Sequence, residues 1–342
     1  MRMTNYFRYL VASTTVLLTM ACLPSAPGDS AGSTTITVYG FSIVKEVLDK
    51  EIYPAFQARW KREHGQNVQF VASYAGSETV TNQILQGARA DIAFLSIDRD
   101  AQRLADGNAT TSDWHAYPNK GIINKTPFVI LVRKGNPKGI TDFADLAKPG
   151  VEVIHPDPVS SGGAQWSILS IYGSELKKSE AETGTPDPAR ALSTLKSIWR
   201  NVRATPGSAR EARTTFELGY FDALITYELE GILMRAAGAE VEMIVPRSTI
   251  FSEHPVVVVD RNVDSKKRPV VDAFIRYLWT DEAQAAFVKY HFRSVTNEAF
   301  NSENQAFATI EQPFTIEMFG GWERAYPDVI EKIFRDQVQG IR

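Results

Sequence analysis

The stretch Val151-Glu-Val-Ile-His-Pro-Asp-Pro-Val-Ser-Ser-Gly-Gly-Ala-Gln-Trp166 indicates the fold class. It opens with a short β-rich run and passes through two serines and two glycines. It then continues with Trp166, Leu169 and Tyr172 at helical spacing. A strand, a serine and a helix in this order form one unit of an α/β fold.

The same unit recurs along the chain. A β-rich run precedes a serine and then a helix-period segment in three more places: Thr35–Tyr39 before Ser42, Val68–Ala72 before Ser77, and Asn201–Ala204 before Ser208. Further buried strands are predicted at Ala90–Leu95, Thr126–Val132, Asp222–Thr226 and Pro255–Val259. Alternating strands and helices predict an α/β class with largely parallel sheets. Of these strands, Thr126–Val132 and Pro255–Val259 are predicted to cross between two lobes.

Length and charge limit the possible function classes. The chain has 342 residues, which is too long for one ordinary core and sufficient for two lobes. Its 37 Lys and Arg against 40 Asp and Glu leave a formal charge of only -3. A nucleic-acid partner is therefore not expected, because there is no basic excess to neutralise phosphates.

The N-terminus has the composition of an export signal. Arg2 and Arg8 flank the start of an apolar run, Tyr9–Ala21, which ends at Cys22, the only cysteine. The run is short for a membrane span, so residues 1–22 are predicted to be a signal peptide and residues 23–33 a flexible linker. Leu18-Thr-Met-Ala-Cys22 resembles a lipoprotein box, although Thr19 departs from it. Cys22 is therefore a predicted lipidation site; the alternative is an incidental cysteine near a conventional cleavage point.

Serines at helix starts predict an anion site. A helix N-terminus presents unpaired N–H groups and a partial positive charge, and several such ends in one cleft can hold an anion without lysine or arginine. Each serine alone is explained by helix capping, and Ser208 with Glu211 forms a capping box. Capping does not explain the glycines that follow Ser161. Gly162 and Gly163 cost helix stability and are justified where a ligand must approach the backbone closely.

Catalytic and metal chemistry find no support in the residues. The five histidines show no metal-ligand spacing, a single cysteine makes no zinc motif, and neither a GxSxG nor a GxxxxGK segment is present. Each histidine is expected on the surface or in a loop. We therefore expect no enzyme activity, no cofactor and no metal. The histidines are His64, His115, His155, His254 and His291.

From about Ile36 to Trp322 the chain resembles the periplasmic sulfate-binding proteins of ABC importers. The matching motifs are Ser73-Tyr-Ala-Gly-Ser77, Val129-Ile-Leu-Val-Arg-Lys-Gly-Asn-Pro-Lys138, Pro156-Asp-Pro-Val-Ser-Ser-Gly-Gly-Ala164, Ala209-Arg210 with Thr215-Phe216, Asp222-Ala-Leu-Ile-Thr-Tyr-Glu228 and Phe319-Gly-Gly-Trp322. The resemblance implies a two-lobed periplasmic-binding-protein clamp. Each lobe is a mostly parallel sheet flanked by helices, and the ligand lies in the interlobe cleft. On this basis lobe 1 is expected at residues 34–125 and 253–342, and lobe 2 at 126–252.

The resemblance also implies the ligand contacts. Ser42 would give a backbone N–H and Ser77 a hydroxyl from lobe 1. From lobe 2, Ser161 would give a hydroxyl, Gly162, Gly163 and Ala209 would give N–H groups, and Tyr227 would occupy the position of a usual tryptophan. The implied function is capture of sulfate or thiosulfate by a monomer for the permease subunits of an ABC importer. The protein would be periplasmic or lipid-anchored on the outer face of the cytoplasmic membrane, with no other membrane contact.

Several departures keep alternatives open. Tyr227 brings a hydroxyl donor of the kind that molybdate-binding proteins use, so molybdate, tungstate or another tetrahedral oxyanion is an alternative ligand. Ser42 stands where the family usually has aspartate. Glu78 and Glu211 lie beside the expected ligand residues, and either one facing the cleft could accept a proton from phosphate. An exported enzyme on the same fold and an anion sensor without a transporter are further alternatives.

Overall fold

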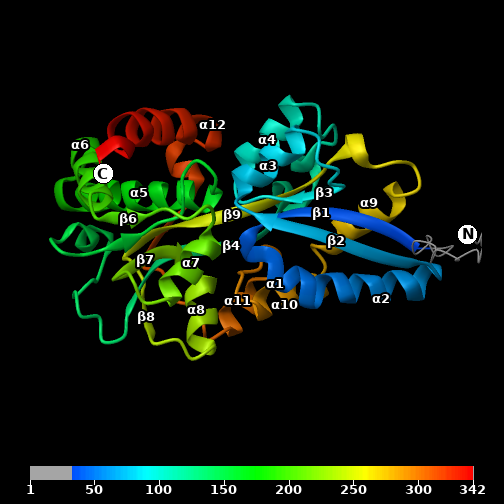
Figure 1. Cartoon of the computed structure of the whole chain (residues 1–342), viewed down its shortest axis with the longest axis horizontal. Helices are drawn as coiled ribbons and strands as arrows, with labels where there is room; N and C mark the ends of the chain where they lie inside the picture. Colours follow the sequence, from blue (N-terminus) through cyan, green and yellow to red (C-terminus); the bar gives the residue numbers. More distant parts are fainter. Residues whose placement is uncertain (1–32, 342) are drawn as a thin grey trace, which may run out of the picture.

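The computed structural model describes residues 33–341. The predicted signal peptide, Cys22 and the linker up to residue 32 lie outside the described residues. Two lobes lie side by side along the long axis and are joined by a pair of long strands (Figure 1). The mixed α/β architecture agrees with the predicted fold class.

The first lobe is built on three parallel strands in the order β2-β1-β3. In Figure 1 the helices α3 and α4 lie above this sheet and α2 lies below it. The elements are β1 (Ser33–Phe41), η1 (Ser42–Val44), α1 (Lys45–Val47), α2 (Tyr53–His64), β2 (Asn67–Ala75), α3 (Ser77–Leu85), β3 (Ile92–Phe94), α4 (Asp98–Asp106), α9 (Arg268–Tyr277), α10 (Asp281–Lys289) and α11 (Glu298–Glu303).

The second lobe continues the sheet in the order β4-β7-β5-β6, with β8 paired to the other edge of β4. Its elements are β4 (Ile122–Arg133), β5 (Val153–Ile154), α5 (Gly162–Thr183), α6 (Pro188–Trp199), β6 (Val202–Ala204), α7 (Ala209–Glu217), β7 (Ala223–Tyr227), α8 (Glu228–Ala236), β8 (Val241–Ile244) and β9 (Ser248–Val258). Strands β5, β6 and β7 run parallel, so their carboxyl ends meet at one edge.

The strands β4 and β9 form the connection between the lobes. The first half of β4 pairs with β9 over Ile122–Pro127, and its second half pairs with β7 and β8. Strand β9 likewise passes from this pairing to β3 at Val256–Val258. All the antiparallel pairings among the described strands involve β4 or β9, which confirms the predicted crossing segments.

Side chains of β4 alternate between two apolar layers. Ile130 and Val132 join the cluster that contains α5 and α6, whereas Val129 and Leu131 join the cluster that contains α7 and α8. Successive residues of a strand point to opposite faces, so one buried run of sequence stabilises both layers. The uninterrupted apolar pattern of this segment is the sequence signature of a strand covered on both faces.

The C-terminal segment differs from the expectation that everything after residue 253 returns to lobe 1. Strand β10 (Gln312–Phe314) pairs with the lobe-2 end of β9, and the helices α12 (Trp322–Ala325) and η8 (Tyr326–Arg335) follow it. Phe334 packs edge-on against Trp199 of α6. Figure 1 shows this segment beside α5 and α6. The chain therefore crosses between the lobes a third time, because these apolar side chains complete the core of lobe 2.

Candidate anion-binding site

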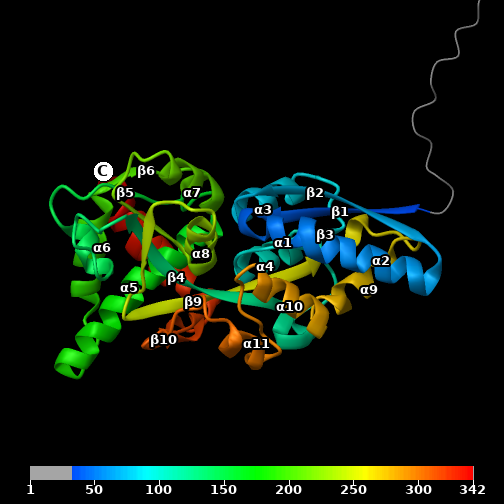
Figure 2. The same cartoon turned by 90° about the horizontal axis from the view of Figure 1, so that it is seen from below.

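The carboxyl ends of the parallel strands of both lobes face one another across the interlobe junction. Strand β1 ends before Ser42, β2 before Ser77, β3 before Ser96, β5 before Ser161 and β6 before Ser208. In an α/β sheet, ligands bind at this edge, because the helix N-termini are collected there. Figure 2 shows the ends of α3 and α7 on the two sides of the junction.

The start of α5 supplies the clearest donors. The backbone N–H groups of Gly162 and Gly163 open the helix and have no acceptor four residues earlier. Ser161 precedes them, is 2% exposed, and its hydroxyl does not cap the helix. A buried hydroxyl that is not used for capping, beside two unpaired N–H groups, is an arrangement suited to an anion.

The two glycines of α5 are required by what lies against them. A Cβ on Gly163 would lie 2.6 Å from the hydroxyl oxygen of Tyr227, and a Cβ on Gly162 would lie 2.9 Å from the Cβ of Ser96. The two glycines in the sequence predicted that another group approaches this backbone closely. In the structure, the side chains of Ser96 from lobe 1 and Tyr227 from lobe 2 do so.

Gly76 permits the lobes to meet. A Cβ at this position would overlap the carbonyl oxygen of Ser160 and lie 2.7 Å from that of Gly207, and both carbonyls belong to the other lobe. The backbone N–H of Thr79 also reaches Ser160 O at 3.4 Å. The structure is therefore a closed clamp, and only glycine fits where the loops of the two lobes touch.

Ser77 is engaged inside its own lobe. Its hydroxyl donates to Asp100 Oδ2 at 2.6 Å and accepts the N–H of Ser96 at 2.9 Å. Burial and the neighbouring Glu78 carboxylate raise the pKa of Asp100 to about 7. The Ser77 hydroxyl, predicted as a ligand donor, is bonded to Asp100 in this structure. The backbone N–H of Ser77, in the first turn of α3, has no intrahelical acceptor.

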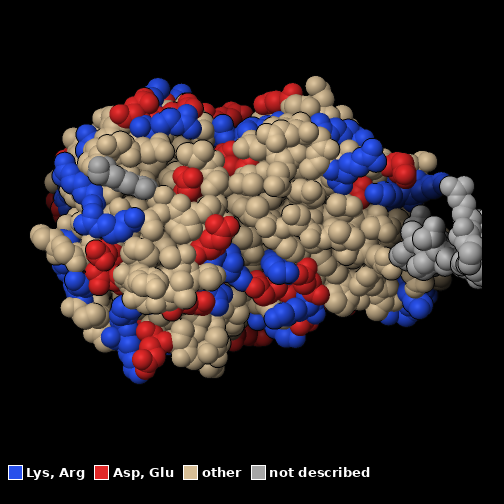
Figure 3. Space-filling model, in the orientation of Figure 1, with Lys and Arg blue, Asp and Glu red and all other residues tan. Residues whose placement is uncertain are grey.

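Ser42 meets the start of α7 between the lobes. The backbone N–H of Arg210, the residue after Ala209, lies 3.4 Å from the hydroxyl of Ser42. The Arg210 guanidinium forms an ion pair with Glu46 of lobe 1, and its Nη2 lies 2.8 Å from Glu230 of lobe 2. Figure 3 shows charged side chains of both signs gathered where α7 and α8 face α1. Arg210 thus links the two lobes, and its positive charge is paired with the carboxylates of Glu46 and Glu230.

Both glutamates beside the expected site residues accept hydrogen bonds from donors of the protein. Glu78 forms ion pairs with Arg99 and Arg103 and accepts a hydrogen bond from Gln165 Nε2 of lobe 2 at 3.0 Å. Glu211 accepts the backbone N–H of Gly207 at 3.0 Å, and its own N–H reaches the Ser208 hydroxyl at 3.2 Å. The predicted capping role of Ser208 is confirmed.

Tyr227 lies at the carboxyl end of β7, and its hydroxyl meets that of Ser96 at 2.9 Å. Both residues are 1% exposed. Burial raises the pKa of Tyr227, so the phenol stays protonated and able to donate. Ser96 was missed in the sequence, although its signal was present: it follows the predicted strand Ala90–Leu95 and precedes α4, as the other serines precede their helices.

The histidines need one correction. His254 is fully buried on strand β9, contrary to the expected surface or loop position, whereas His155, also buried, lies in the loop after β5. His254 Nδ1 lies 2.6 Å from Asn124 Oδ1 on the neighbouring strand, and burial lowers the pKa of His254 to about 3. This histidine is therefore a neutral packing residue of the connecting strands. Within residues 33–341, no group of three or more His, Cys, Asp or Glu is placed to hold a metal ion.

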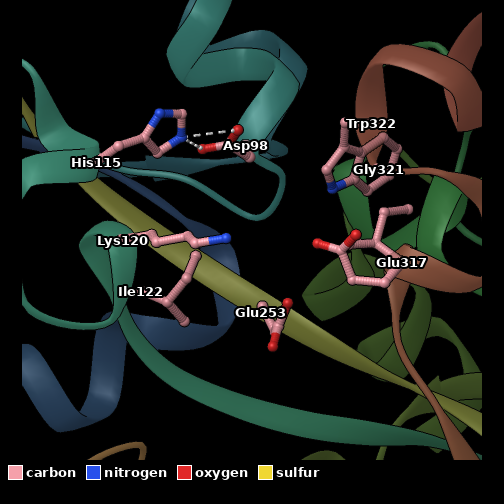
Figure 4. Close-up of a pocket in the computed structure, with 9 residues that line it drawn as sticks. Asp98, His115, Lys120, Ile122, Glu253, Glu317, Gly321 and Trp322 are labelled. Atoms are coloured by element: carbon pink, nitrogen blue, oxygen red, sulfur yellow. Dashed lines mark hydrogen bonds and ion pairs between the residues drawn. The ribbon is translucent and has the colours of Figure 1, made fainter.

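A hollow of about 400 Å³ lies between the lobes, away from the expected site residues. Lys120 and Glu317 reach into it from opposite sides, with Glu253 on its floor and His115 paired with Asp98 at its rim (Figure 4). Trp322 lines the side of lobe 2. This flanking cleft differs from the anion site because charged side chains, rather than backbone N–H groups, face its interior.

Comparison with known proteins matches these features to one family. Residues 36–293 match the family model described as bacterial extracellular solute-binding protein. The chain belongs to this family. Within it, the chain is 34% identical to a "Sulfate-binding protein" of Synechococcus elongatus, over 93% of this chain and 91% of that protein. A "Thiosulfate-binding protein" of Pseudomonas aeruginosa is 32% identical over 80% of this chain and 82% of that protein.

A solved structure extends the match to the fold. The sulfate-binding protein SubI from Mycobacterium tuberculosis superposes with a TM-score of 0.78 and 31% identity, over 86% of this chain and 98% of that one. No helix within the described residues of this solute-binding protein is long and apolar enough to cross a bilayer.

Proposed function

We propose that this protein captures sulfate or thiosulfate outside the cytoplasm and delivers it to the permease of an ABC importer. The observation that carries the proposal is the start of α5, where a buried, non-capping Ser161 hydroxyl adjoins the unpaired N–H groups of Gly162 and Gly163. The names of the relatives support the same ligands.

The proposed donors come from both lobes. They are the N–H groups of Ser42, Ser77, Gly162, Gly163 and Ala209 and the hydroxyls of Ser161 and Tyr227. Hydrogen bonds to a charged group contribute about 1.5–3 kcal/mol each, so seven of them sum to roughly 10–20 kcal/mol before the costs of closure and immobilisation. A Kd of about 1 μM needs only about 8 kcal/mol, so tight binding without a cation in the site is attainable.

Molybdate or tungstate is the second candidate, favoured by one observation. The donor at position 227 is a phenol, which resembles the hydroxyl donor of molybdate-binding proteins, and it lies 2.9 Å from the hydroxyl of Ser96. All these anions offer four oxygens in a tetrahedron, and they differ in size.

The purified protein should be titrated calorimetrically with sulfate, thiosulfate, molybdate, tungstate and phosphate in parallel. We expect sulfate or thiosulfate to bind at about 1 μM or tighter. Absence of binding for every anion below about 100 μM would overturn the proposal, and molybdate binding far tighter than sulfate would favour the second candidate. The bound anion should be recovered unchanged, which separates a binding protein from an enzyme.

The proposal includes a lipid anchor at Cys22 and a monomeric mature protein. The apolar run that ends at Cys22 supports the anchor, and the residues before it match an export signal. In cells fed a labelled fatty acid, the wild-type protein should carry the label and the Cys22→Ser variant should not. Label on neither protein would leave conventional signal cleavage as the explanation.

A further inference from the structure

Two hydroxyls from different lobes meet over the start of α5. Ser96 lies at the carboxyl end of β3 in lobe 1, and Tyr227 lies at the carboxyl end of β7 in lobe 2. Their oxygens are 2.9 Å apart, and either one can be the donor. Each is 1% exposed, so water does not compete for them.

Neighbouring contacts fix both side chains. The backbone N–H of Ser96 donates to Ser77 Oγ at 2.9 Å, and the carbonyl of Ser96 accepts the indole N–H of Trp166 at 2.6 Å. The Tyr227 ring packs against Phe128 at a centroid distance of 4.6 Å and against His254 at 5.7 Å. The two oxygens face the first turn of α5, where the N–H groups of Gly162 and Gly163 are unpaired.

Counting protons shows what this pair can do. Two hydroxyls carry two protons, and the bond between them uses one. If Tyr227 donates to Ser96, the Ser96 proton remains for a ligand; if Ser96 donates, the Tyr227 proton remains. Whichever hydroxyl donates, lone pairs stay available on the pair. The pair can therefore give one hydrogen bond to an unprotonated oxygen, or accept one from an O–H of the ligand while its second proton turns to another ligand oxygen.

A single hydroxyl lacks this freedom. Without the Ser96 hydroxyl, Tyr227 could still accept a hydrogen bond from an O–H of the ligand. Its own proton could then no longer be donated to Ser96. A buried donor without a partner costs free energy comparable to a lost hydrogen bond. The surrounding N–H groups cannot help, because they only donate.

We propose that Ser96 is a specificity-determining residue of the anion site, and that the Ser96–Tyr227 pair lets the site accept tetrahedral oxyanions that carry a proton. This inference rests on the proposed function. Sulfate carries no proton at neutral pH, whereas monohydrogen phosphate carries one. The pair therefore narrows the difference in affinity between the two dianions.

The test compares three dianions of similar shape by calorimetry: sulfate, phosphate and monofluorophosphate, in which fluorine replaces the O–H of phosphate. The proteins are the wild type, Ser96→Ala, Tyr227→Phe and a control, Ser170→Ala. The control removes another buried hydroxyl pair, that of Ser170 with Thr249 at 2.9 Å, which lies away from the helix starts. The melting temperature of each variant reports whether it folds.

We expect the wild type to bind phosphate measurably at millimolar concentration. Ser96→Ala should weaken phosphate about tenfold or more while sulfate and monofluorophosphate change less than about threefold, because Tyr227 still donates to them. Tyr227→Phe should weaken all three anions, because it also removes a proposed sulfate donor, and Ser170→Ala should change none of the three.

Two results would overturn the inference. One is a wild type that binds sulfate but shows no phosphate binding at millimolar concentration. The other is a Ser96→Ala variant in which all three anions weaken by the same factor, which would make Ser96 a structural contact between the lobes. A wild type that binds neither sulfate nor thiosulfate would instead refute the proposed function, so the two failures are distinguishable.

Discussion

Two regions lie between the lobes, the proposed anion site and the flanking cleft, and different chemical groups line their interiors. The anion site presents backbone N–H groups and hydroxyls, and the charges around it, such as Arg210 and Glu78, are bound to partners on both lobes. In the flanking cleft, Lys120 and Glu317 point inward from opposite sides (Figure 4). If the proposed site is correct, fixed dipoles hold the anion, and the nearby ionic side chains serve the closure of the clamp.

The reason is the cost of desolvation. A lysine that faced a buried anion would itself have to lose water, and a mobile side chain would have to be ordered at each binding event. The first turns of α3, α5 and α7 are already ordered by the fold. If the comparison holds, changes at the helix starts should reduce affinity strongly, and changes in the flanking cleft should not.

The largest effect is expected from Gly76→Val. A side chain there overlaps the carbonyl of Ser160, so the lobes cannot reach the closed arrangement. We expect sulfate affinity to fall at least 100-fold, measured by calorimetry, with little change in melting temperature. Gly340→Ala is the control, because nothing lies within 4 Å of the added carbon. Undiminished binding by Gly76→Val would contradict the closed geometry as the binding state.

Ser161→Ala should have the next largest effect. The hydroxyl that it removes is buried and does not cap α5. A lost hydrogen bond to a charged ligand costs about 1.5–3 kcal/mol, which corresponds to roughly a 10- to 150-fold weaker Kd. The control is Ser302→Ala on α11, whose hydroxyl bonds only within its helix. An effect as small as that of the control would remove Ser161 from the site.

Glu46→Gln should weaken binding about two- to fivefold. It breaks the ion pair with Arg210 between the lobes, and pairs that are partly exposed are worth about 0.2–1 kcal/mol. Arg210 keeps its bond to Glu230, so no buried charge is stranded. The difference between wild type and variant should shrink in high concentrations of a chloride salt, because salt screens the pair. A salt-independent difference would contradict an ionic contribution to closure.

Lys120→Ala and Glu317→Ala should change sulfate affinity less than about twofold. These side chains line the flanking cleft and take no part in the hydrogen bonds around Ser161 or Ser96. Competition binding with a labelled sulfate would measure so small a difference. A tenfold loss in Lys120→Ala would mean that this lysine attracts or contacts the anion, and would remove the distinction between the two regions.

The sequence predicted those features that depend on local pattern. Strand, serine and helix recur with their periodicities, so the α/β class, the crossing segments β4 and β9 and the helix starts could be predicted. Gly87 and Gly219 mark helix ends in the same local way, because both have positive φ just beyond the ends of α3 and α7. The conformation of these residues is determined by their neighbours in the sequence.

What could not be predicted depends on contacts between distant segments. The hydrogen bond from the Ser77 hydroxyl to Asp100 requires α3 and α4 to be placed side by side. Ser96 lies in the same pattern as the other serines, but its meeting with Tyr227, 131 residues later, requires both lobes to be folded and closed. The return of β10 to lobe 2 is set by apolar packing of Phe334 and Trp322, which local pattern does not assign to a lobe.

That return of the C-terminal segment has a consequence for the order of folding. Residues 312–341 complete the core of lobe 2 through contacts such as Phe334 with Trp199 and Trp322 with Trp166. Lobe 2 thus depends on a segment far along the sequence from its other elements, and its core stays incomplete until residues 312–341 have packed against α5 and α6.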